Sequence, residues 1–352
     1  MIATYHKHIL NFKTPGGTSR GVLKTKETWF LILRENNRFG IGECGILRGL
    51  SIDDRPEYEE KFRWLCANIS LGEDKLYDAL TEFPSLQFGV ETAFKSFKAA
   101  DSFNLFPSEF TSGEASIPIN GLVWMGDKTF MKQQILDKLK QGFSCIKMKI
   151  GAIDFKTEIE LLQSIRKEFS STDIELRVDA NGVFLASEAL EKLKVLSELQ
   201  LHSIEQPIKP GQWQEMARLC QETHLPIALD EELIGVFSED KKVKLLQTIQ
   251  PHYIILKPSL IGGFKGSDQW ISLAENFGAG WWMTSALESN IGLNAISQYT
   301  FTKNSKLPQG LGTGSLYTNN INSPLKVESG RIFYSQADNW NLNVLNFNNP
   351  IT

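Results

Sequence analysis

The sequence has few cysteines and no long apolar run. Its 352 residues include four cysteines, and no two of them form a CxxC pair: Cys44, Cys66, Cys145 and Cys220. This spacing predicts neither a disulfide framework nor a zinc site. No apolar stretch approaches the ~18 residues that a membrane span needs, and the opening residues lack the features of a secretory signal. The pattern predicts a cytoplasmic protein without a membrane partner.

An excess of one charge sign is also absent. The formal net charge is −4, and charged residues make up 22% of the chain. Such a balance gives no excess of basic residues that would indicate binding to nucleic acid. The five histidines have no spacing typical of metal ligands. With 41% hydrophobic residues, the chain has an ordinary globular composition, and it is long enough for a barrel of about 250 residues with an appended module.

The first hundred residues indicate an α+β module. Three strand-like segments rich in aromatic and β-branched residues come first, and two segments with helical spacing follow. The strands are expected at residues 3–12, 22–34 and 39–45, and the helices at 57–69 and 88–100.

Alternating strands and helices fill the next part of the chain. Seven strand-like segments recur from about residue 116 to about residue 313, and residues 117–120 form the first of them. Helices are expected between them, for example at residues 129–141. The tail is expected to contain a hairpin with its turn at Ser329 and Gly330 and to pack back on the first module.

Five of these strands end on an ionisable residue. The residues are, in chain order, Lys147 with Lys149, then Asp179, Glu205, Asp230 and Lys257. Positions 149, 179, 205, 230 and 257 are 30, 26, 25 and 27 residues apart, the length of one strand, one helix and two short loops. Because parallel barrels keep their active sites at the C-terminal ends of the strands, this pattern predicts an enzyme.

Lys147 and Lys149 are two residues apart in one strand, so both side chains point to the same face, the inside of a barrel. Repulsion between the two ammonium groups, together with partial burial, should lower a lysine pKa from its usual ~10.4 and make one lysine a suitable general base. A pair of surface lysines on an edge strand is the alternative. The apolar Ile146, Met148 and Ile150 around them argue against it.

The three carboxylates Asp179, Glu205 and Asp230 each follow an apolar strand. Singly, each would more often be a helix N-cap or an ion-pair partner. Together at one barrel mouth they would repel one another unless a cation lay among them, and oxygen ligands without His or Cys select Mg²⁺ or Mn²⁺. Asn181 and Glu231 are expected beside these ligands, with helix capping as their alternative role.

Lys257 ends the next strand of the series. It could be a second proton-transfer group, a cation that holds the substrate, or the structural partner of Asp230. Two further positions are candidates for binding an anionic substrate group. Gly262 lies in a Gly-Gly loop that allows close backbone approach, and Ser285 lies at the start of a helix. Chain turning and ordinary capping are their alternatives.

Together these motifs resemble the enolase superfamily, in the branch of the muconate lactonizing enzymes. The Lys-x-Lys, the Asp, Glu and Asp of the next three strands and the Lys of the sixth carry the resemblance, which covers essentially the whole chain. The strings Asp-Ala-Asn-Gly, Ser-Ile-Glu-Gln-Pro and Lys-Pro-Ser-Leu-Ile-Gly-Gly are similar to the o-succinylbenzoate synthases. The resemblance implies a (β/α)7β TIM-like barrel at residues 106–313 and an α+β capping domain at residues 1–105. The tail, residues 314–352, would pack on the capping domain.

The resemblance also implies a reaction. It is the Mg²⁺-dependent dehydration of 2-succinyl-6-hydroxy-2,4-cyclohexadiene-1-carboxylate, a small anionic carboxylate, to o-succinylbenzoate in menaquinone synthesis. Lys149 would remove the proton α to the carboxylate, giving an enediolate, and would then protonate the departing hydroxide in a syn elimination. Lys147 would orient Lys149, and Lys257 would lie as a cation against the ring. Capping-domain loops near residues 14–19 and 45–51 would close over the site.

The implied ligand set for Mg²⁺ is that of the three carboxylates Asp179, Glu205 and Asp230. The same residues would serve an N-acylamino acid racemase or a dipeptide epimerase, in which Lys149 and Lys257 exchange a proton from opposite faces. The chain lacks the Asp-x-Asp that a dipeptide epimerase uses for its substrate ammonium. A muconate cycloisomerase is a third option, and a non-catalytic barrel is disfavoured because every lysine and carboxylate is present. The pattern selects no oligomeric state.

Overall fold

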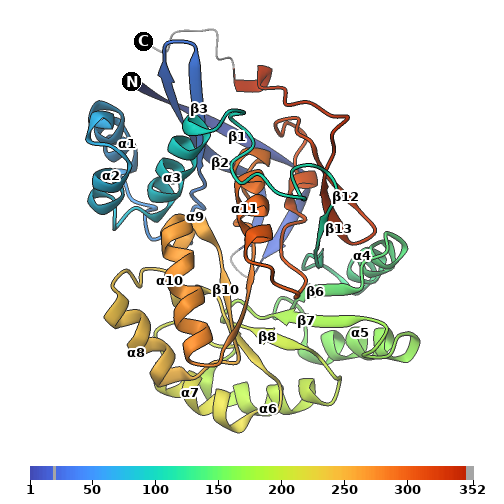
Figure 1. The fold of residues 1–352 in the computed structure, drawn as a ribbon. Helices are drawn as coiled ribbons and strands as arrows, with labels where there is room; N and C mark the ends of the chain where they lie inside the picture. Colours follow the sequence, from blue (N-terminus) through green and yellow to red (C-terminus); the bar gives the residue numbers. More distant parts are fainter. Residues whose placement is uncertain (19–20, 346–352) are drawn as a thin grey trace.

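The chain forms an antiparallel module and a parallel barrel (Figure 1). The computed structural model describes residues 1–18 and 21–345. Ser19, the last residue of a predicted capping loop, and residues 346–352, the end of the predicted tail, lie outside them. The antiparallel module begins with three strands in sequential order: β1 (Ile2–Thr18), β2 (Gly21–Glu35) and β3 (Arg38–Cys44).

Helices cover one face of this sheet. They are α1 (Tyr58–Ala67), the short η1 (Ile69–Leu71), α2 (Glu73–Ala79) and α3 (Pro84–Lys98). The helix α2 was not predicted. Helix α3 and strand β3 touch backbone to backbone, because a Cβ at Gly42 would lie 2.0 Å from the carbonyl oxygen of Gly89. Glycine at position 42 is therefore required by the packing.

The barrel sheet, as far as the chain is described, has seven parallel strands in sequential order. They are β5 (Gly121–Val123), β6 (Cys145–Lys149), β7 (Glu175–Asp179), β8 (Ser203–Glu205), β9 (Ile227–Leu229), β10 (Tyr253–Leu256) and β11 (Gly280–Met283). Their buried side chains are mainly Ile, Leu, Val and Met, as expected for strands covered on both faces.

Helices surround the strands on the outside (Figure 1). They are α4 (Lys128–Lys140), α5 (Phe155–Glu168), α6 (Ala186–Ser197), α7 (Trp213–Glu222), α8 (Glu239–Ile249), α9 (Pro258–Ile261), α10 (Gly263–Asn276) and α11 (Asn290–Thr302), with 3-10 turns η2 (Glu231–Leu233) and η3 (Thr313–Leu316). Single bridges from Gln309 to Ile119 and from Gly310 to Thr284 join the two ends of the sheet. The predicted α/β barrel with an α+β module is the observed fold.

The opening of the barrel differs from the prediction. Residues 117–120 do not form its first strand. Instead β4 (Ser116–Pro118) pairs antiparallel with β13 (Arg331–Tyr334), which forms the predicted hairpin with β12 (Leu325–Glu328). Pro118 explains the difference, because proline cannot donate a hydrogen bond to a central strand and is found at sheet edges.

The tail packs against the sheet of the first module. Ile321 and Leu345, the last residue of η4 (Asn343–Leu345), are buried in one cluster with Phe30 and Ile41. The end of the described chain therefore contacts the capping strands.

Two buried carboxylates of the first module cap helices of the barrel. Glu43 accepts hydrogen bonds from the backbone N–H groups of Ser289 and Gly292 at the start of α11, both at 2.8 Å. Glu91 accepts from the N–H groups of Phe264 (2.5 Å) and Lys265 (3.0 Å) at the start of α10. Because helix N-termini carry unsatisfied donors and partial positive charge, these contacts fix the module on the barrel.

Glu91 should make stability depend on pH. Burial raises its pKa to about 8, although the two backbone donors lower it. The folded protein then binds more protons than the unfolded chain between the ordinary carboxyl pKa and about pH 8, so the free energy of unfolding should fall as pH rises through this range. We expect this slope to be smaller in Glu91→Gln, measured by urea unfolding at several pH values. Parallel curves for the two proteins would contradict the assignment.

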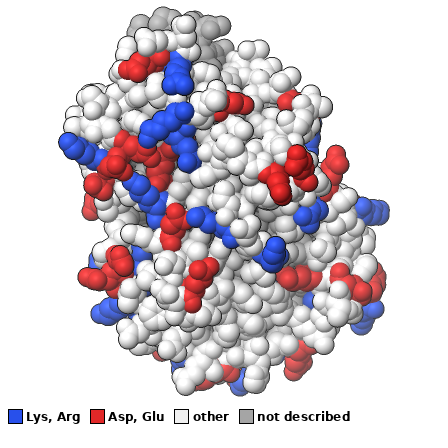
Figure 2. Space-filling view, in the orientation of Figure 1, with Lys and Arg blue, Asp and Glu red and all other residues white. Residues whose placement is uncertain are grey.

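The surface carries both charge signs. Figure 2 shows lysine, arginine and acidic side chains interspersed over the face that it draws.

The four cysteines are free, and three of them are buried. No helix in the described ranges is both long enough and apolar enough to cross a membrane.

Candidate active site

The strand register places the predicted site residues at the same end of the sheet. Lys149 of β6 lies opposite Asp179 of β7, which in turn lies opposite Glu205 of β8. Asp230 follows the end of β9, and Lys257 follows the end of β10. All of these side chains therefore meet at the C-terminal mouth of the barrel, the edge where such folds carry their chemistry.

Ion pairs connect the lysines with the carboxylates. Lys147 Nζ lies 3.0 Å from Asp179 Oδ2 and also pairs with Glu205 Oε2. Lys149 Nζ donates to Asp179 Oδ2 at 2.9 Å and to Asn181 Oδ1 at 2.7 Å. Two ammonium groups thus share one carboxylate oxygen.

A fourth ion pair involves the lysine that follows β10. Lys257 pairs with Asp230, while Asn181 Nδ2 donates to Glu231 Oε1 at 3.0 Å. Asn181 therefore links Lys149 to the acidic turn that follows Asp230. The structure thus brings all of the predicted lysines and carboxylates together at one place.

The pKa shifts show which charges dominate. Burial alone would lower the pKa of Lys147, but its carboxylate neighbours, Asp179 first, outweigh burial and raise it. The prediction that repulsion lowers this pKa is therefore wrong for Lys147, because its nearest charges are acidic. Burial raises the pKa of Asp179, but Lys147 and then Lys149 bring it below its usual value. Burial, followed by the charge of Asp179, raises the pKa of Glu205.

The three carboxylates fit a hard divalent cation in their chemistry. All ligand atoms would be oxygens, the type that Mg²⁺ prefers. Glu205 Oε1 is buried and has no hydrogen-bond partner among the described residues, so a cation would satisfy it. In the ranges described, no three His, Cys, Asp or Glu side chains converge closely enough to hold an ion, because Lys147 and Lys257 pair with the same carboxylates. A bound ion would replace these lysine contacts.

Strained backbone follows two of the carboxylate strands. Asn181 and Gln206 have φ angles of +46° and +38°, in the left-handed region that few non-glycine residues adopt. Gln206 uses its side chain to accept from the N–H of Asp230 (3.2 Å) and to donate to Glu232 (3.0 Å). This side chain holds the ends of β8 and β9 at a fixed separation.

A cavity of about 400 Å³ opens above the network, and both modules line it. Barrel residues at its base include Lys147, Lys149, Asp179 and Lys257. Leu47 and Leu50 come from the predicted capping loop at residues 45–51, and Thr14 comes from the one at residues 14–19. The sequence did not single out the other wall residues: Lys13, Leu23, Trp124, Leu287, Thr313 and Leu316. Trp124 directly follows β5, so the rule that strand ends carry function could have identified it. Lys13 and Leu23 of the capping module have no comparable signal.

Two of the three predicted substrate-binding residues reach this cavity. Asn181 and Ser285 line it, but Gly262 does not. Gly262 lies at the seam between the modules, where its carbonyl accepts from the hydroxyl of Tyr77 at 2.6 Å and its φ of +94° ends α9. As a glycine it allows the chain to turn between α9 and α10. Chain turning was the alternative role given for Gly262 from the sequence.

Glu288 is a buried carboxylate that the sequence reasoning did not select. It accepts hydrogen bonds from the hydroxyls of Ser259 and Ser285, both at 2.5 Å. Thr313 in turn donates to Ser285 Oγ at 2.9 Å. Glu288 therefore ties the loops after β10 and β11 together and fixes the direction of the Ser285 hydroxyl.

Glu288→Gln should destabilise the fold. An amide offers only one acceptor oxygen, so one of the two serine hydroxyls would lose its buried partner, at a cost of about 1–3 kcal/mol. We expect the free energy of unfolding in urea to fall by that amount, with no comparable change in Glu239→Gln on the exposed start of α8. Equal stability of the three proteins would show that Glu288 does not organise these loops.

Comparison with known proteins places the chain in a family. Residues 131–337 match the family model described as enolase C-terminal domain-like. An o-succinylbenzoate synthase of Desulfotalea psychrophila (strain LSv54) is 45% identical over 361 residues, which cover 94% of this chain and 98% of the relative.

A solved structure and a second relative complete the comparison. The crystal structure of MenC from Desulfotalea psychrophila LSv54 superposes with a TM-score of 0.84 at 40% identity, covering 95% of this chain and 99% of that one. An N-succinylamino acid racemase of Thermus thermophilus is 33% identical over 154 residues, covering 44% of this chain and 39% of the relative. The chain belongs to the enolase superfamily, in the family of the o-succinylbenzoate synthases.

Proposed function

We propose that this chain is a Mg²⁺-dependent o-succinylbenzoate synthase. The relative from Desulfotalea psychrophila, similar over nearly its whole length, carries that name. What supports the reaction in this chain is the meeting of Lys149, Lys257 and Asp179 at one cavity. The substrate would be 2-succinyl-6-hydroxy-2,4-cyclohexadiene-1-carboxylate, and the reaction would take place in the cytoplasm.

The carboxylates of Asp179, Glu205 and Asp230 would hold the metal. Mg²⁺ would supply the positive charge that stabilises the negative charge developing on the substrate carboxylate as its α-proton leaves. Lys147, two residues before Lys149 on the same face of β6, would orient Lys149.

Lys149 would act as both base and acid. Its Nζ is held by Asp179 and Asn181, so the amine has a fixed position at the cavity. It would take the proton from the carbon α to the carboxylate, and the C–H electron pair would move toward the carboxylate to give an enediolate. That electron pair would then form the new ring double bond as the C–O bond breaks. The same Nζ would return its proton to the departing hydroxide, which leaves as water.

The other cavity residues would position the substrate. Lys257 would lie as a cation against the ring. Asn181 and Ser285 would contact polar groups of the substrate. Apolar side chains such as Leu50 and Leu287 line the same space and would limit the access of water, which strengthens the electrostatic contacts inside.

Racemisation of an N-acylamino acid is the second candidate. Lys149 and Lys257 come from different strands and line the same cavity, as a proton exchange between opposite faces of one carbon requires. The Thermus thermophilus relative named as an N-succinylamino acid racemase supports this reaction over part of the chain.

A direct assay tests the proposal. Purified protein with Mg²⁺ should consume the cyclohexadiene substrate, followed by loss of diene absorbance, and EDTA should stop the reaction until Mg²⁺ is restored. Folded, Mg²⁺-loaded protein that leaves the diene unchanged would overturn the substrate assignment.

A further inference from the structure

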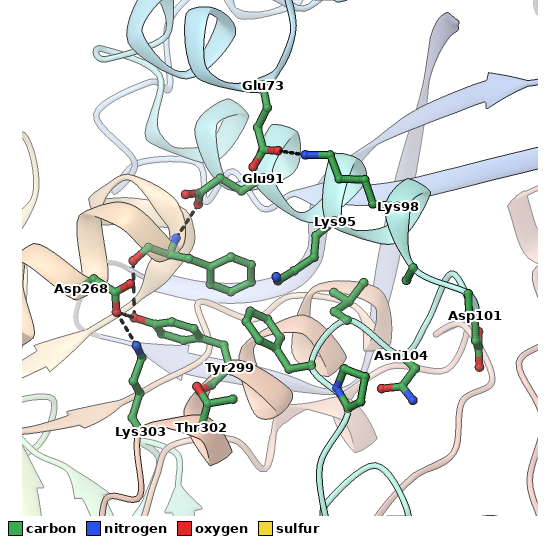
Figure 3. A pocket seen from close by; sticks show the side chains of 16 residues that line it. Glu73, Glu91, Lys95, Lys98, Asp101, Asn104, Asp268, Tyr299, Thr302 and Lys303 are labelled. Carbon is green, nitrogen blue, oxygen red and sulfur yellow. Dashed lines mark hydrogen bonds and ion pairs between the residues drawn. The ribbon is translucent and has the colours of Figure 1, made fainter.

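A second cleft lies between the capping module and the barrel. It has a volume of about 630 Å³, and none of the residues that line it also lines the catalytic cavity. Its walls come from α3, from residues 99–107 and from the helices α10 and α11 (Figure 3). The reaction proposed above gives this cleft no role.

Aromatic rings form one wall of this cleft. Phe106, Phe264 and Tyr299 contact one another, with ring centroids 5.3 Å, 5.9 Å and 4.7 Å apart. Phe264 and Tyr299 belong to barrel helices, whereas Phe106 belongs to the segment that leaves the capping module. A flat apolar ligand on this wall would therefore contact both parts of the chain.

Lys95 is a cation at this cleft without an acidic partner. The other two lysines of the cleft are paired, Lys98 with Glu73 at 2.7 Å and Lys303 with Asp268 at 2.6 Å (Figure 3). Lys95 forms no ion pair with any carboxylate in the described ranges. Its half-buried side chain points into the cleft, and its Nζ lies 4.2 Å from the ring centroid of Phe106 (Figure 3).

Asn104 supplies an unsatisfied acceptor in the same cleft. Its Oδ1 is buried and has no hydrogen-bond partner in the part of the chain that the structure describes. A buried acceptor of this kind destabilises the protein until a donor reaches it. The cleft thus combines an ammonium group that lacks an anion, an oxygen that lacks a donor, and an aromatic wall.

We propose that this cleft binds a small aromatic acid that carries a hydroxyl group. The carboxylate of the ligand pairs with Lys95, its hydroxyl donates to Asn104 Oδ1, and its ring lies on Phe106 and Tyr299. Because these residues come from both sides of the seam, the bound acid stabilises the capping module on the barrel. The proposal does not depend on the reaction at the catalytic cavity.

Calorimetric titration of the whole protein with 3-hydroxybenzoate tests this site. We expect saturable 1:1 binding that Lys95→Met weakens about tenfold or more, the effect of losing one charge-assisted contact. Lys95→Arg keeps the charge and should keep most of the affinity. Lys149→Ala, in the catalytic cavity, should bind as tightly as the unmodified protein.

A comparison of two ligands tests the hydroxyl contact. Benzoate lacks the donor and should bind more weakly than 3-hydroxybenzoate, and Asn104→Leu should remove this difference. The site is disproved if titration shows no saturation, if Lys95→Met and Lys95→Arg bind as the unmodified protein does, or if only Lys149→Ala loses binding. If Lys95→Met does not fold, Asn104→Leu and the benzoate comparison decide the question.

Discussion

Lys149→Ala should lose at least about a thousandfold in kcat for dehydration, the upper range of the effect of a positioned acid–base group. The change removes the only atom assigned to both proton transfers. The change leaves Lys147 and the three carboxylates in place, so the metal site and the fold should remain. Steady-state kinetics with Mg²⁺, together with circular dichroism, measures both effects.

A lysine outside the site provides the matched control. Lys128 is exposed on α4 and pairs with Glu160 at 2.7 Å. Lys128→Ala should leave kcat unchanged. If Lys149→Ala retains more than a tenth of the activity, another group removes the proton, and Lys257 would be tested next by the same substitution.

Glu205→Gln should abolish the response to Mg²⁺. The substitution keeps the shape of the side chain but removes one of three carboxylates and the charge on the buried Glu205 side chain. Loss even of groups that only orient metal ligands lowers affinity about 10- to 100-fold, so loss of a ligand should lower it at least about 100-fold. Added Mg²⁺ should raise the melting temperature of the unmodified protein and should have little effect on the variant.

The stability measurement separates metal binding from catalysis. Glu160→Gln, on the exposed face of α5, should show the same Mg²⁺ stabilisation as the unmodified protein. An equal rise in melting temperature for Glu205→Gln would show that Glu205 is not a ligand. In that event the buried carboxylates would be only the partners of Lys147 and Lys257.

The catalytic network could be predicted because its residues end apolar strands. Hydrophobic runs of a few residues at regular spacing indicate parallel strands, and the C-terminal ends of parallel strands share one edge. Lys149, Asp179 and Glu205 therefore had to meet, and the strand register places them opposite one another. No knowledge of the loops was needed.

Other features depended on contacts between distant parts of the chain. The pKa of Lys147 could not be predicted from the neighbouring Lys149 alone, because carboxylates on other strands raise it. The position of Gly262 at the seam depends on Tyr77 of the capping module. Glu288 precedes a helix in the sequence, and only the fold brings it to Ser259.

Side-by-side kinetics on two substrates distinguish a dehydratase from a racemase. The purified protein with Mg²⁺ is assayed for dehydration of the cyclohexadiene carboxylate, and by NMR for exchange of the α-proton of N-succinylamino acids in D₂O. We expect a value of kcat/KM for dehydration well above that for exchange, with both activities lost in Lys149→Ala. A larger value for exchange, or exchange without dehydration, would contradict the assignment as an o-succinylbenzoate synthase and would favour the racemase.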